Sequence, residues 1–144
     1  MKKLQGNWNY QSFVSVPADV DRTKPPTDPE HIKRPALIAS AWTPPSVMEF
    51  ATDADGHITG TANLGPIVFD ITGDIKPAVD AWIPEGIELV VTVAQTASVY
   101  HLRGYFLKDS DHIVGTVVAI SKDLAFQPHP VGTSGPFVLY PVHE

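Results

Sequence analysis

Three ionisable side chains, Tyr10, Tyr100 and Asp70, fall inside runs of β-prone residues. Each could take part in acid–base chemistry if its strand directs it into the interior of the protein. Tyr10 shares one face of its run with Trp8 and Ser12, and a period of two makes this the expected inward face of a strand. Tyr100 shares a face with Ser98 and Leu102 in the same way. Asp70 stands in the middle of the run 67–72. If Asp70 faces inward, burial raises its pKa and suits it to proton transfer; if it faces outward, it is simply solvated.

Other kinds of chemistry have little support in the sequence. There is no cysteine, which excludes disulfides, thiol catalysis and thiolate metal sites. No serine lies in a nucleophile elbow, and no glycine-rich phosphate loop is present. No histidine lies two or four residues from another, so no metal-ligand spacing is visible among His31, His57, His101, His112, His129 and His143. We therefore expect neither a metal nor a cofactor.

Composition favours a single soluble domain over residues 1–144, with 43% hydrophobic and 18% charged residues. The net charge of −6 argues against nucleic acid or an anionic membrane as a partner. The basic start of the chain is not followed by an apolar signal core, and no apolar run approaches the ~20 residues that span a bilayer. We expect a cytoplasmic protein without membrane association.

Short alternating runs separated by turn residues predict an all-β fold. The run 4–16 places Trp8, Tyr10, Ser12 and Val14 on one face. Asp-Gly at 55–56, Gly-Pro at 65–66 and the polar residues 108–111 are typical of turns between strands. The expected strands are 4–16, 47–51, 57–63, 67–72, 87–95, 98–107, 112–121 and 137–142, with a Gly/Pro loop at 122–136. Eight such strands predict an antiparallel up-and-down β-barrel.

The long segment 17–45 between the first two strands breaks this pattern, because it holds seven of the 14 prolines. Its first half, 19–34, is charged, whereas 35–42 is apolar and rich in alanine. A loop of this length is often a lid or a binding loop. We expect a lid-like loop whose apolar half, as a short helix or extra strand, packs on the body with Trp42 over the barrel mouth. The alternative is a solvated insertion anchored by one Trp.

The order of these pieces resembles the avidin/streptavidin family and, more loosely, the lipocalins. The residues that carry the resemblance are the Gly-x-Trp of 6–8, the hairpin 55–61, Thr72-Gly73, and the runs 86–93 and 100–121. It implies an eight-stranded barrel that opens at one end and packs against other barrels. The family's biotin-binding residues are replaced, since Tyr10, Val14 and Ala62 stand where Asn, Ser and Tyr are expected. We expect no tight biotin binding.

The resulting functional prediction is binding of a small apolar or aromatic ligand inside the barrel. An isomerase or cyclase that uses the same cavity, as in allene-oxide-cyclase-like barrels, is the alternative, with Tyr10, Tyr100 and Asp70 as its acid/base groups. A third possibility is an interaction module whose interior is filled. The candidate ligand-binding residues are Trp8, Tyr10, Ser12, Trp42, Phe50, Ser98, Tyr100 and Leu102.

Several strands are apolar on both faces, notably in the runs 67–69, 89–91, 113–114 and 117–120. Adjacent residues of a strand point to opposite sides, so some of these side chains face out of the barrel. Exposed apolar surface of this kind often marks an interface. We therefore expect a homodimer or homotetramer.

Overall fold

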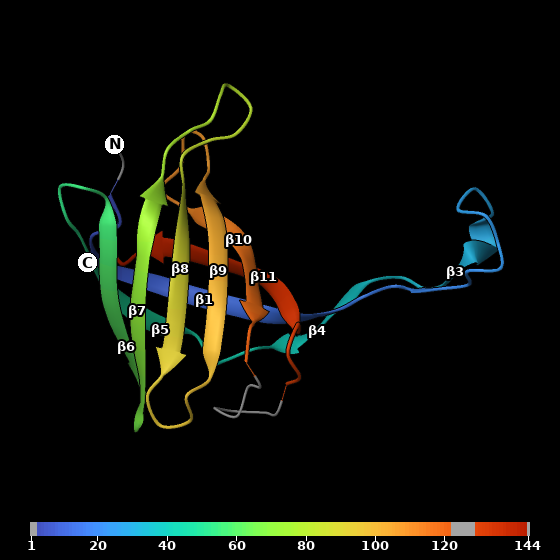
Figure 1. The fold of residues 1–144 in the computed structure, drawn as a ribbon, viewed down its shortest axis with the longest axis horizontal. Helices are drawn as coiled ribbons and strands as arrows, with labels where there is room; N and C mark the ends of the chain where they lie inside the picture. The colour runs from blue at the N-terminus through green and yellow to red at the C-terminus, as the bar shows by residue number, and fades with distance from the viewer. Residues whose placement is uncertain (1–2, 122–128, 144) are drawn as a thin grey trace.

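The computed structural model describes residues 3–121 and 129–143, and it confirms the predicted closed antiparallel barrel of eight strands (Figure 1). Each barrel strand pairs with the next one along the chain, and the last pairs with the first to close the barrel. The strands are β1 (Gly6–Val16), β5 (Ser46–Thr52), β6 (His57–Leu64), β7 (Ile67–Lys76), β8 (Gly86–Val93), β9 (Val99–Phe106), β10 (Ile113–Ala119) and β11 (Ser134–Pro141).

The period-two pattern of the sequence is reproduced by the burial of the strands. In β1, the residues Trp8, Tyr10, Ser12 and Val14 are buried, while those between them are half-buried. The same alternation in the other strands builds one apolar core inside the barrel. Hydrophobic burial on the inner face therefore fixes the register of the strands.

Two strand boundaries differ from the prediction by three residues or more. β7 continues to Lys76, four residues past the expected end, because Gly73 and Asp74 still pair with β6 and β8. β11 begins at Ser134 instead of residue 137, and residues 122–128 of the predicted loop lie outside the described residues. A Cβ on Gly135 would overlap the carbonyl of Phe13, so only glycine lets β11 approach β1 there.

The segment 17–45 forms a projecting arm and not a cover. β4 (Leu37–Ala41) pairs with residues 13–16 of β1, and further out β2 (Asp19–Val20) pairs with β3 (Ile32–Arg34) beside the short 3-10 turn Pro29–His31. Figure 1 shows this ribbon extending away from the barrel. Every residue of β4 is exposed, so the expectation that this apolar stretch packs on the body is wrong. Its backbone pairs with β1, whereas its apolar side chains stay exposed.

A bulge joins the arm to the barrel. The amide of Trp42 donates to the carbonyl of Ser12 at 2.9 Å, and Ser46 pairs with Tyr10. Residues 43–45 therefore lie opposite the single residue Gln11. Pro44 and Pro45 have no N–H to donate, which suits a stretch outside the ladder.

The barrel end nearest the chain start is held closed by Leu4 and Thr52. The Thr52 hydroxyl donates to the Leu4 carbonyl at 2.6 Å and accepts from the Leu4 amide at 3.2 Å. Trp8 is buried near this end, and its indole N–H donates to the Gln5 carbonyl at 2.9 Å. Over the described ranges, no helix has the length and apolar character needed to cross a membrane.

Candidate functional site

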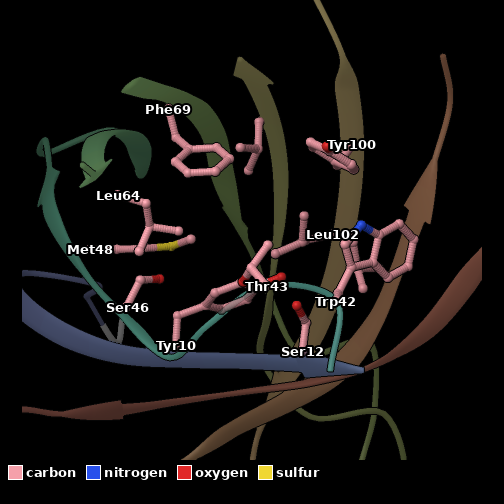
Figure 2. Close-up of a pocket in the computed structure, with 12 residues that line it drawn as sticks. Tyr10, Ser12, Trp42, Thr43, Ser46, Met48, Leu64, Phe69, Tyr100 and Leu102 are labelled. Atoms are coloured by element: carbon pink, nitrogen blue, oxygen red, sulfur yellow. The ribbon is translucent and has the colours of Figure 1, made fainter. Parts of the chain in front are cut away.

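A pocket lies toward the opposite end of the barrel, and its lining includes Leu64 at the end of β6 and Thr43 in the bulge of the arm (Figure 2). Five of the eight predicted residues line it: Tyr10, Ser12, Trp42, Tyr100 and Leu102. The alternation in β1 and β9 is the signal that located four of these. Trp42 was found from its place at the end of an apolar stretch.

The other three predicted residues are buried but do not line the pocket. Trp8 lies toward the closed end of the barrel. Phe50 packs against Gly60, where an added Cβ would lie 2.7 Å from the phenylalanine ring. The Ser98 hydroxyl is bonded to the Thr96 hydroxyl at 2.8 Å. Inward alternation thus identifies burial, but it does not say at which height of the barrel a residue lies.

Seven lining residues were not predicted, and they fall into two kinds. The apolar ones occupy inward positions that the alternation of their strands indicates: Met48, Leu64, Phe69, Val91 and Val117. Ser46 is the first residue of β5 and lies in phase with the inward Met48. Thr43 belongs to the bulge, where no periodic pattern exists, so sequence periodicity offered no signal for it.

The indole of Trp42 fills the mouth of the pocket. Its ring lies edge-on to Tyr100, with centroids 5.9 Å apart at 86°, and 5.4 Å from the ring of His129. Only 5% of Trp42 is exposed. The pocket that remains leaves ≈ 20 Å³ for the centre of a water-sized sphere, which is room for about one water molecule.

A group of hydroxyls lies on the β1 side of this pocket. Tyr10 and Ser12 point into it from β1 in Figure 2, and the Ser12 hydroxyl lies close enough to Tyr10 to oppose the rise in the Tyr10 pKa. The Thr43 hydroxyl oxygen is buried and has no hydrogen-bond partner within the part of the chain that the structure describes. Such orphaned buried oxygens are uncommon, because each forfeits its hydration.

The proposed acid/base set is not assembled in this pocket. Asp70 is exposed on the outer face between Phe69 and Ile71, which are buried, so the hypothesis of an inward Asp70 is wrong. Burial raises the pKa of Tyr10 far above its ordinary value, although its bond to Ser12 opposes the shift. Tyr10 is therefore a neutral phenol near pH 7, able to donate a hydrogen bond but not to act as a base.

The charged residues gather on the outer face of the barrel. His101 and Arg103 point away from the core, and both contact Glu88, at 3.1 Å from the imidazole and 3.7 Å from the guanidinium. Nδ1 of His57 lies 2.6 Å from the Asp74 carboxylate, and this hydrogen bond raises the pKa of His57. Across residues 3–121 and 129–143, no three His, Asp or Glu side chains are grouped to hold a metal ion.

Comparison of the chain with known protein families, with curated proteins and with solved structures found no match. The fold is described by the structure itself: an all-β, closed, eight-stranded antiparallel barrel, compatible with a calycin-like fold.

Proposed function

We propose that the protein binds one small apolar or aromatic ligand at the Trp42 end of the barrel. A closed barrel of about eight strands is wide enough to be filled by side chains or to hold one small ligand. The avidin-like and lipocalin-like resemblance of the sequence supports the second use. The observation that carries the proposal is that an aromatic side chain from the arm, not from the barrel wall, occupies the mouth.

Binding requires Trp42 to leave, because the room beside it holds about one water molecule. Trp42 stands at the junction of β4 and the bulge, outside the ladder that joins β1 to β5. The three residues 43–45 that follow it are not paired in that ladder. Rotation about the side-chain bonds of Trp42 can move the indole out while its backbone N–H stays bonded to the Ser12 carbonyl, so the barrel strands stay paired and Thr43 keeps its place. A ligand of similar size then replaces the contacts of the indole with Tyr100.

Titration with naphthalene, followed by the shift of the unfolding midpoint, tests this proposal. Val91 and Val90 are neighbours in β8 with opposite faces: Val91 is buried and lines the pocket, whereas Val90 is 37% exposed on the outer face. Val91→Phe should abolish binding, at a cost in stability of about 1–3 kcal/mol from overpacking. Val90→Phe is the matched control and should bind as the unaltered protein does.

Two outcomes would argue against a binding barrel. If naphthalene causes no shift in the unaltered protein, Trp42 is a permanent part of the core and the filled-interior alternative is favoured. If Val90→Phe weakens binding as much as Val91→Phe, the ligand lies on the outer face.

We further propose that the barrel assembles as a homodimer or homotetramer. Outward side chains of the barrel are exposed at Val47 (48%), Val90 (37%) and Ile120 (50%). The arm adds Ile32 (54%) and Ile38 (52%), which nothing in the described chain covers. Exposed apolar side chains and an unsupported two-stranded ribbon both favour contact with a second copy.

A further inference from the structure

The hydroxyl groups that line the pocket carry more O–H donors than the contacts among them require. Tyr10 and Ser12 each bring a hydroxyl to the pocket. The Ser12 hydroxyl opposes the rise in the Tyr10 pKa, as a donor to the phenol oxygen does, and this leaves the Tyr10 O–H hydrogen available for another acceptor. Thr43 brings another, because its buried oxygen has no partner among the described residues. Two donor hydrogens on one side of a small pocket match the two lone pairs of a single carbonyl oxygen.

The charge of the pocket limits the ligand further. Among its lining residues in the described chain, none carries a formal charge: the polar ones are Tyr10, Ser12, Thr43, Ser46 and Tyr100. His129, whose ring centroid lies 5.4 Å from that of Trp42, is a neighbour of the slot but not one of the lining residues. Beside the hydroxyls of Tyr10, Ser12 and Thr43, a carboxylate or ammonium ion would be buried without a charged lining residue, at a large desolvation cost. A neutral acceptor has no such cost.

The space that the Trp42 indole occupies determines the shape of the ligand that can replace it. Its indole is a flat, two-ring group that meets Tyr100 edge-on at 86°. A ligand that replaces the indole lies in the same slot and contacts the same aromatic ring, that of Tyr100. Flat ring systems gain additional stabilisation in this edge-to-face arrangement.

We propose that the site recognises an uncharged carbonyl compound with a flat, apolar ring system. Its rings occupy the slot of the Trp42 indole, and its carbonyl oxygen accepts hydrogen bonds from the hydroxyls of Thr43 and Tyr10. This assignment of ligand class rests on the proposed binding function.

Three probes of similar size separate the class from simple apolar binding: 2-acetylnaphthalene, 2-ethylnaphthalene and 2-naphthoate. We expect the ketone to lose about 3- to 10-fold in affinity in Thr43→Val, the range of one neutral hydrogen bond. The hydrocarbon 2-ethylnaphthalene should bind the unaltered protein and Thr43→Val with equal affinity. The carboxylate should bind more weakly than the ketone. The matched control is Thr72→Val, since Thr72 is exposed on the outer face of β7.

The outcomes distinguish this inference from the function on which it rests. If the hydrocarbon binds and the affinity for the ketone is unchanged in Thr43→Val, the assignment of a carbonyl ligand is wrong. The proposal that the barrel binds a small ligand still stands in that case. Tightest binding by the carboxylate also overturns the assignment of an uncharged carbonyl ligand. Failure of all three probes to bind overturns both. Thr43→Val should fold at least as stably as the unaltered protein, because it removes an unsatisfied buried oxygen.

Discussion

Replacement of Trp42 by alanine tests whether the indole can be displaced by a ligand or is a permanent part of the core. In the structure, 5% of Trp42 is exposed, and its ring contacts Tyr100 and His129. Alanine removes the indole but leaves the backbone bond from residue 42 to the Ser12 carbonyl. The variant should therefore keep its barrel and gain a slot shaped like indole.

The magnitude follows from the buried area. An aromatic side chain buries about 150–250 Å², and about 25 cal/mol per Å² gives roughly 4–6 kcal/mol. This is an upper bound because the unfolded chain already hides part of that surface. Measured truncations of this kind cost about 3–5 kcal/mol, and we expect about 3 kcal/mol because Trp42 lies at the mouth. Indole at ten times its dissociation constant should restore about 1.4 kcal/mol.

The assay is urea denaturation of the unaltered protein, Trp42→Ala and Trp82→Ala, each with and without indole. Trp82 is the matched control because 90% of it is exposed. Its replacement should change the free energy of unfolding by less than about 0.5 kcal/mol, and indole should not alter the result. Circular dichroism should show the same strand content in all three proteins.

Two results would refute the reasoning. A loss below about 1 kcal/mol in Trp42→Ala would mean that the indole is not packed in the barrel mouth in solution. A loss near 3 kcal/mol that indole does not reverse would mean that the pocket collapses, as expected of a core without a ligand site.

Other predictions concern the outer face and the assembly. The Asp74 hydrogen bond raises the pKa of His57 above 6.5, so a proton NMR titration should show it falling in Asp74→Asn. The raised folded-state pKa stabilises the fold below pH 6.5, and this stabilisation is lost as the pH rises through the raised value. Gly135→Ala should cost at least about 2 kcal/mol in urea denaturation, because its Cβ overlaps the Phe13 carbonyl. Light scattering should give twice or four times 15.6 kDa, and a mass near 15.6 kDa would exclude the oligomer.

Local pattern explains why some site residues could be predicted and others could not. Tyr10, Ser12 and Tyr100 follow from alternation, since a strand with one buried face sends every second side chain inward. The outward direction of Asp70 follows from the same rule, once Phe69 and Ile71 are taken as the buried residues of β7. Thr43 lies in a bulge, where the alternation is interrupted and pattern has no predictive value.

The sequence by itself determined the all-β class, the eight strands and the inward face of each, because hydrophobic alternation and turn chemistry are local properties. Tertiary structure alone decided that the proline-rich segment leaves the barrel as a ribbon and that a buried Thr43 oxygen lies in the same pocket as Tyr10 and Ser12. These features depend on which distant residues meet after the barrel closes. Composition and periodicity do not specify such contacts, because they carry no information about pairing across 30 or more residues.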